Sequence, residues 1–101
     1  MYIYNVTIKV DWSIHEKWLT WMLEIETYRM TAGPYLTNHQ LLRLNEIDEA
    51  DGPTYAVQYH TSSLEMYKAY VDEQMAVDNA ASYALWGQHC VFFTTIMKVV
   101  S

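Results

Sequence analysis

The sequence is short of cysteine, of basic residues and of long apolar runs, and each shortage bears on the class of protein. Its single cysteine, Cys90, cannot form an internal disulfide bond, which is typical of a reducing compartment. Six basic residues stand against 12 acidic ones, so we expect no nucleic-acid partner for a chain of net charge -6. No apolar run approaches the roughly 20 residues that cross a bilayer, so we expect no membrane partner either.

Targeting and cofactor motifs are also missing. The first residues, Met1 to Asn5, lack the basic start and apolar stretch of a signal peptide, and with the lone cysteine this predicts a cytoplasmic protein. There is no phosphate loop, nucleotide fingerprint or heme-attachment motif, so no cofactor is expected. A length of 101 residues with 51% apolar residues suits one core, which predicts a single domain over residues 1–101.

Hydrophobic periodicity predicts six elements in the order β-α-β-β-α-β. Alternation at period two predicts a first strand, and extended runs predict three more: Met1–Val10, His39–Leu44, Thr54–Thr61 and Cys90–Val100. One helix is predicted from Ile14 to Met30 behind a capping box of Ser13 and Glu16, and a second from Ser62 or Ser63 to Gly87. The inward stripes of the two helices are predicted to be Ile14, Trp18, Trp21, Met22 and Ile25, then Leu64, Tyr67, Val71, Met75, Tyr83 and Trp86.

This order predicts a ferredoxin-like α+β fold, a four-stranded antiparallel sheet with spatial order 4-1-3-2 and both helices on one face. Nine tyrosines and four tryptophans exceed what one helix-covered layer buries, so a second copy should cover the open face. We therefore expect a homodimer built as a dimeric α+β barrel, with Tyr4 and Tyr59 as candidate interface residues.

Several segments resemble a family of short bacterial proteins known only as a domain of unknown function. The resemblance covers nearly the whole chain and is carried by Met1–Thr7, Ser13–Glu16, Trp18, Trp21-Met22, Leu42–Leu44, Gly52–Tyr59 and Trp86-Gly87. It implies the dimeric α+β barrel fold and no established activity.

The departures from this family gather at pocket positions. The family carries His-Ile-Pro, His-Ala-Pro with a following arginine, and Arg-Thr, where this chain has Glu26–Tyr28, Gln74–Ala76 with Asn79, and Thr94-Thr95. It also has aromatic residues at the places of His39, His60 and Cys90. The resemblance thus implies either a divergent relative with a new ligand or a pocket rebuilt by engineering.

One candidate catalytic group lies at the edge formed by the second and third strands. The hairpin between them should place His39 opposite His60, with Leu41 opposite Gln58 on the same face. Glu26, at the end of the first helix, could then orient either imidazole as a general base. Two histidines and one glutamate could also bind zinc, but their spacing carries no metal motif, and we predict no metal.

A second candidate is Cys90 as the nucleophile of an ester hydrolase. Strand geometry places Cys90 level with Thr54, on the order of 20 Å from His60, so these two should not form a dyad. His15, in the first turn of the first helix, lies at the correct end of the sheet to act as its base. The alternative is that Cys90 only fills the core.

These observations leave three functions open. The first is a binding protein that holds a small apolar ligand between helices and sheet, with binding residues Asn5, Gln58, Gln74, Phe92 and Thr94. The second is an enzyme, either a hydrolase using Cys90 or a general-base catalyst using Glu26 and a histidine. The third is an interaction module that acts through its dimer surface. The aromatic residues Trp18, Trp21, Tyr67 and Trp86 are interpreted as core in all three.

Overall fold

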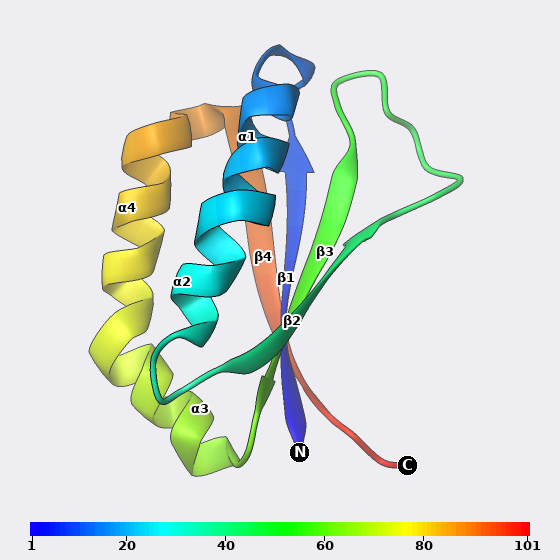
Figure 1. Ribbon diagram of the computed structural model, residues 1–101. Helices are drawn as coiled ribbons and strands as arrows, with labels where there is room; N and C mark the ends of the chain where they lie inside the picture. The colour runs from blue at the N-terminus through cyan, green and yellow to red at the C-terminus, as the bar shows by residue number, and fades with distance from the viewer.

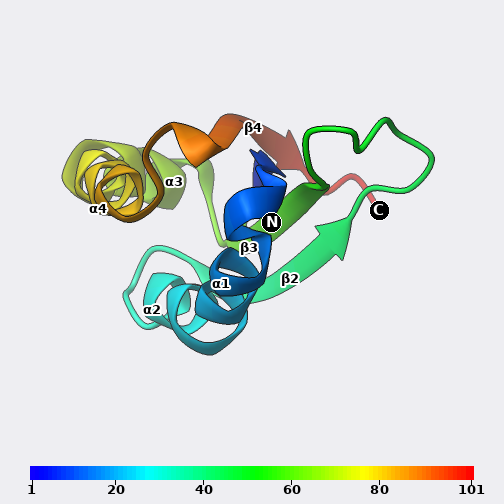
Figure 2. The same cartoon turned by 90° about the horizontal axis from the view of Figure 1, so that it is seen from above.

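The computed structural model describes residues 1–101 and confirms the predicted α+β architecture (Figure 1). The strands are β1 (Tyr2–Val10), β2 (Thr37–Arg43), β3 (Thr54–Thr61) and β4 (Cys90–Lys98). They form one antiparallel sheet in the order β2-β3-β1-β4, as predicted. Both helices lie on the same face of this sheet, which leaves the opposite face without a covering layer (Figure 2).

Each helix is interrupted by a π-helical segment. The first helix consists of α1 (His15–Trp21), the π segment η2 (Met22–Glu26) and α2 (Thr27–Thr31). The second consists of α3 (Leu64–Tyr70), the π segment η3 (Val71–Met75) and α4 (Ala76–Trp86), followed by a 3₁₀ turn, η4 (Gly87–His89). Neither helix is long and apolar enough to cross a membrane.

The π segments correct the predicted inward stripes. Hydrogen bonds in a π segment span five residues instead of four, so residues four and five apart share a face. In the first helix Glu26 and Thr27 are buried with Met22, whereas Ile25 is 54% exposed. The prediction for Ile25 was therefore wrong. In the second helix the predictions for Leu64, Val71 and Tyr83 were also wrong, since all three are exposed and the buried residues are Tyr70 and Asp78.

The helix ends follow capping chemistry with one correction. Ser63 caps α3 as predicted, because its Oγ accepts a hydrogen bond from the Met66 amide at 3.1 Å. Ser13 is not the first cap: Asp11 accepts from the Ser13 amide and starts the 3₁₀ turn η1 (Trp12–Ile14) ahead of α1. Gly87 ends α4 with a positive φ of 55°.

The core lies between the helices and the sheet. Strand side chains alternate, so Tyr4, Val57 and Tyr59 point towards the helices and are at most 2% exposed. Tyrosine and tryptophan do not line the open face, contrary to the prediction, since no strand position on that face holds either residue type. Tyr4 and Tyr59 are core residues and not candidates for a surface on the open face.

The β2–β3 pairing also corrects a prediction. His39 lies opposite Tyr59, and Thr37 lies opposite His60, because a bulge at Asn38 (φ 48°) inserts one residue between them. Leu41 pairs with Val57 instead of Gln58. A shift of one residue turns a side chain to the other face, so His39 and His60 do not face each other.

The β2–β3 loop closes on the end of β1 at Gly52. A Cβ atom at Gly52 would lie 1.7 Å from the Val10 carbonyl oxygen, and its φ of 152° is one that other residues rarely adopt. Val10 in turn donates its amide to the Pro53 carbonyl at 2.9 Å. This close approach fixes the loop against the sheet.

Gly52→Ala should therefore lower the free energy of unfolding by more than about 1 kcal/mol, because the new methyl group displaces the loop from β1. Urea unfolding followed by circular dichroism measures the change. Gly33→Ala is the matched control, since no atom lies within 4 Å of its added Cβ. Equal stability of the two variants would contradict the packing described for Gly52.

Candidate functional site

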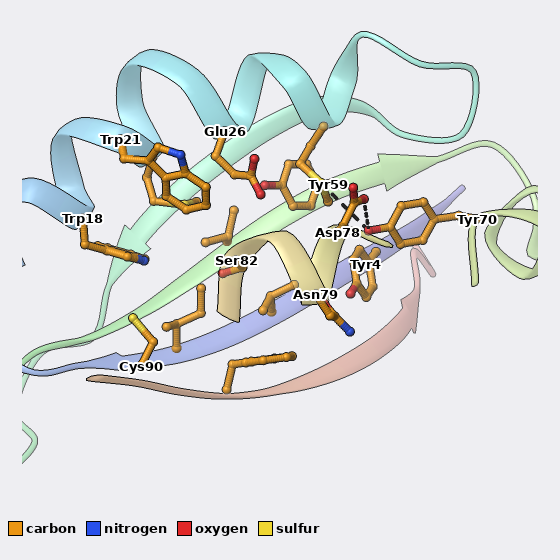
Figure 3. A pocket seen from close by; sticks show the side chains of 16 residues that line it. Tyr4, Trp18, Trp21, Glu26, Tyr59, Tyr70, Asp78, Asn79, Ser82 and Cys90 are labelled. Carbon is orange, nitrogen blue, oxygen red and sulfur yellow. Dashed lines mark hydrogen bonds between the residues drawn. The ribbon is translucent and has the colours of Figure 1, made fainter. Parts of the chain in front are cut away.

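The candidate site is a cavity of about 70 Å³ between the two helices and the sheet (Figure 3). Twelve of its 16 lining residues are hydrophobic, so its surface is mainly apolar. Its residues are Tyr4, Val6, Ile8, Val57, Tyr59, Cys90 and Phe92 from the strands, Trp18, Trp21, Met22, Glu26 and Met30 from the first helix, and Tyr70, Asp78, Asn79 and Ser82 from the second.

One end of the cavity is apolar. Trp18 is 1% exposed and packs on Tyr55 with ring centroids 5.0 Å apart. Trp21 meets Trp86 of α4 edge to face at 5.6 Å, which joins the two helices at this end. Cys90 is drawn towards this same end in Figure 3, away from the charged groups.

The other end holds a charged cluster that also joins the two helices. Arg29 forms a two-point contact with Glu26, from Nε to Oε1 at 2.7 Å and from Nη2 to Oε2 at 2.9 Å. Its Nη1 donates to Asp78 Oδ1 of α4 at 2.8 Å. Two buried carboxylates thus share one guanidinium, and the cluster carries a formal charge of -1.

Two neutral side chains complete the contacts of Asp78. The Tyr70 hydroxyl donates to Asp78 Oδ2 at 2.8 Å, and Gln74 Nε2 donates to Oδ1 at 3.1 Å. Burial, with the nearby Tyr4 and the Asp78 contact, raises the pKa of Tyr70 well above its usual value. Tyr70 therefore stays a hydrogen-bond donor throughout the neutral range.

The π segments place these carboxylates. Glu26 is the last residue of η2, and Asp78 follows shortly after η3. In η2 the Thr27 amide and hydroxyl both donate to the Met22 carbonyl, the hydroxyl at 2.9 Å, so the widened turn keeps its backbone acceptor satisfied. π-helical segments are rare and occur often at functional sites, and here two of them flank one cavity.

Tyr59 presents an unused polar group to the cavity. Its side chain is 2% exposed, and its hydroxyl takes part in none of the side-chain hydrogen bonds of the structure. Figure 3 shows this hydroxyl turned towards the Glu26 carboxylate. Burial, followed by the charge of Glu26, raises the pKa of Tyr59 far above its usual value, so the phenol is neutral.

Three of the predicted site residues line this cavity: Glu26, Cys90 and Phe92. Gln74 lies one step behind it as a hydrogen-bond partner of Asp78. Thr94 is on the helix-facing side of β4, but it is exposed and does not line the cavity.

Two predicted ligand residues lie on the opposite face. Asn5 donates to Thr7 Oγ1 at 3.1 Å and accepts from Gln58 Nε2 at 3.3 Å. Asn5 and Gln58 are paired across β1 and β3 on the face without helices. They form a polar centre of the open face and not a wall of the cavity.

The predicted contacts of the histidines are not formed. Glu26 is bound by Arg29 and not by an imidazole, His39 packs edge to face on Tyr28 at 5.5 Å, and His60 points to the open face. No group of three histidine, cysteine, aspartate or glutamate side chains is placed to hold a metal ion.

Cys90 and His15 are likewise separate groups. His15 Nε2 hydrogen-bonds the Tyr55 hydroxyl at 2.7 Å and stacks on that ring. Burial, followed by the charge of Asp11, raises the pKa of Cys90 to about 11. Only about one molecule in 10⁴ then holds the thiolate at pH 7.

Arg29 and Asp78 were missed by the sequence analysis although both left a signal. Arg29 stands three residues after Glu26, a spacing that places ion pairs on one helix face. Asp78 stands three residues after Met75 in the predicted inward stripe, and a charge in an apolar stripe indicates a buried polar site.

Arg29→Met should destabilise the fold, because it leaves two buried carboxylates without a counter-charge. Removing one partner of a fully buried pair costs about 3 to 5 kcal/mol, and the 43% exposure of the Arg29 side chain should reduce this to about 1 to 3 kcal/mol. Urea unfolding at neutral pH measures the loss. Arg43→Met, which breaks the exposed pair with Glu49, is the control and should cost less than about 1 kcal/mol. Equal losses of unfolding free energy in the two variants would mean that the cluster does not stabilise the packing of the two helices.

Two solved structures share the fold across almost the entire chain. One is a dimeric ferredoxin-like protein from an uncultured marine organism, with a TM-score of 0.63, 13% identity, and coverage of 99% of this chain and 95% of that chain. The other is a mutant of MhuD with two manganese protoporphyrin IX molecules bound per active site, with a TM-score of 0.62, 15% identity, and coverage of 100% and 96%. At such low identity these structures establish a ferredoxin-like fold and nothing more.

Sequence comparison gives the family. No curated protein matches the chain significantly. The family described as "Domain of unknown function (DUF4286)" matches residues 1–100, which is nearly the complete sequence. With the ferredoxin-like fold and the predicted resemblance both confirmed, the chain belongs to the DUF4286 family of unknown function.

Proposed function

We propose that this protein binds a small molecule in the cavity between its helices and its sheet. The observation that carries the proposal is a mainly apolar cavity in which Glu26, Asp78 and Tyr59 converge at one end. A concave apolar surface with a few placed polar groups is the usual form of a small-molecule site. The proposal keeps the cytoplasmic location favoured by the single cysteine.

The position of the cavity also fits the departures from the family. Glu26 and Cys90, two residues at which the chain differs from the pattern it resembles, both line it. A diverged or engineered pocket would change at such positions while the scaffold stays constant. The ligand should then differ from that of other family members.

A porphyrin does not suit this cavity. Its volume of about 70 Å³ is far below the roughly 300 to 1,000 Å³ of sites that enclose drug-sized ligands. No histidine lines it, and its one thiol is held protonated by burial. The ligand we propose is a small molecule with an apolar body and one polar end.

We also propose that two copies associate through the open face of the sheet. The apolar residues exposed there lie on the edge strands: Leu42 on β2 and Val91, Phe93 and Met97 on β4. The similar marine protein is a dimeric ferredoxin-like protein, which supports association of two copies here. The polar pair of Asn5 and Gln58 would then lie inside the interface and fix its register.

The hydrolase alternative has less support. A nucleophilic cysteine needs a base within hydrogen-bond reach and a lowered pKa, and here His15 is bonded to Tyr55 while burial raises the pKa of Cys90. The general-base alternative lacks its imidazole, because neither His39 nor His60 lines the cavity. Binding therefore accounts for more of the geometry than catalysis does.

Ligand binding is tested with a set of small neutral, cationic and anionic molecules, followed by NMR of the tryptophan indole N–H groups. We expect at least one molecule to shift the signals of Trp18 and Trp21, which line the cavity, while exposed Trp12 serves as an internal reference. Ser82→Phe should abolish the shifts by filling the cavity. Ala84→Phe, an exposed change on the same helix, should leave them intact. If no molecule in the set shifts Trp18 or Trp21, the proposed binding function is rejected.

Association is tested by light scattering at micromolar concentration, where a dimer has a mass near twice 11.9 kDa. Phe93→Asp should shift the protein to the monomer, since a carboxylate inside the interface loses its hydration. Tyr83→Asp is the matched control: its side chain is 63% exposed against 64% for Phe93, but it lies on α4 and should leave the mass unchanged. A monomeric parent protein, or the same mass for both variants, would overturn the proposed interface.

A further inference from the structure

The charge that faces the cavity differs from the charge of the cluster as a whole. Glu26 and Asp78 line the cavity, and their side chains are 10% and 6% exposed. Arg29, which binds both, is not among the lining residues, and its side chain is 43% exposed towards solvent. The cavity wall therefore contains the two carboxylates and not their counter-charge.

These carboxylates retain acceptor capacity. Each ionised carboxylate offers about four lone-pair positions. Glu26 uses two of them on Arg29, and Asp78 uses three on Arg29, Gln74 and Tyr70. The free positions belong to buried atoms, which gain little from water, so a donor that enters the cavity would find them unoccupied.

The Tyr59 hydroxyl is a free hydrogen-bonding group in the cavity wall. The Tyr59 side chain is 2% exposed and lines the cavity, and its hydroxyl takes part in none of the side-chain hydrogen bonds of the protein. A polar group that a pocket presents without an internal partner is available to fix the orientation of a ligand. Because the phenol is neutral, its oxygen can accept a hydrogen bond from a cation that also contacts Glu26 (Figure 3).

The remaining walls define the rest of the ligand. Beyond the carboxylates the cavity is bounded by Val57, Ile8, Met22 and the indoles of Trp18 and Trp21, none of which is charged. The rings of Tyr4 and Tyr59 lie stacked with centroids 6.3 Å apart and present aromatic surface near the charged end. A volume of about 70 Å³ limits the ligand to a short chain or a single ring.

From these features we infer that the cavity selects a small primary amine in its ammonium form, carrying a short apolar body. The three N–H donors of the ammonium meet the Glu26 carboxylate, the Asp78 carboxylate and the Tyr59 hydroxyl, and the body lies against Trp18 and Trp21. The ligand's charge neutralises the excess negative charge of the cluster. This inference names the ligand class of the proposed function and rests on it.

Other ligand classes fit less well. An anion in the cavity would lie against two carboxylates in a wall that contains no cation, so its charge would be repelled. A divalent metal needs several oxygen ligands at once, and no such group of three acidic or histidine side chains exists here. A neutral alcohol offers one donor where the site has three acceptors.

The test compares three ligands of nearly equal shape on the unmodified protein: 3-methylbutylammonium, 3-methylbutanol and 3-methylbutanoate. Binding is followed by the indole N–H shifts of Trp18 and Trp21 at neutral pH. We expect the ammonium to bind roughly 10-fold or more tightly than the alcohol, as hydrogen bonds to charged groups are stronger, and the carboxylate to bind weakest. An alcohol that binds as tightly as the ammonium would overturn the inference and leave the binding function standing. If none of the three shifts the indoles but other molecules of the wider set do, the inference alone fails.

Neutralising either carboxylate tests the geometry. Asp78→Asn and, separately, Glu26→Gln should each lower ammonium affinity by roughly 10-fold while changing alcohol affinity by less than about 2-fold. Asp72→Asn is the matched control: it removes the same charge from an exposed position of the same helix and should leave both affinities unchanged. If all three variants lost the same ammonium affinity, the net charge of the protein would explain the effect, and the proposed site would be overturned. If one cavity variant fails to fold, the other variant and the three-ligand comparison still decide the question.

Discussion

The ion pairs of Arg29 are the constraint on which the arrangement of the two helices depends. One guanidinium binds Glu26 of its own helix and Asp78 of the other helix, at distances of 2.7 to 2.9 Å. Both carboxylates are buried, so neither helix can move away without leaving a charge unpaired in the interior. The Trp21 and Trp86 contact joins the same helices at the apolar end. The cavity is the space that these two fixed contacts leave above the sheet.

The π segments make this cluster possible. A regular helix would continue its apolar stripe with a residue such as Ile25, but η2 turns Glu26 and Thr27 inward and Ile25 outward. The structure thus exposes an isoleucine and buries a carboxylate. An arrangement selected only for stability would bury the isoleucine and expose the carboxylate. Such a departure from the hydrophobic pattern is expected where a fold carries a function.

The opposite face of the sheet has a different character. It holds a polar centre at Asn5 and Gln58 and apolar residues such as Phe93 on the edges. The tyrosines that suggested a covered open face from composition instead fill the helix side, because strand alternation directs Tyr4 and Tyr59 there. The association that we propose through this face would therefore rest on fewer apolar groups than composition suggests, and more on the match of its polar centre.

The sequence by itself determined the element order, the sheet topology and the family. Strand periodicity located Thr54–Thr61 to the residue, and Ser63 and Gly87 marked the ends of the second helix, because these signals are local and depend on neighbours only a few residues away. It also named Glu26 and Cys90 as catalytic candidates and Phe92 as a binding residue, and these three line the cavity.

Only the tertiary structure decided which residues meet. The bulge at Asn38 separated His39 from His60, and the pairing of Arg29 with Asp78 spans 49 positions of sequence, so neither follows from local spacing. The pKa of Cys90 depends on burial and on the charge of Asp11, which only packing brings near. A one-residue shift in a strand or a widened helical turn leaves composition unchanged and redirects side chains to the other face. For this reason the sequence identified some of the site residues but not the contacts between them.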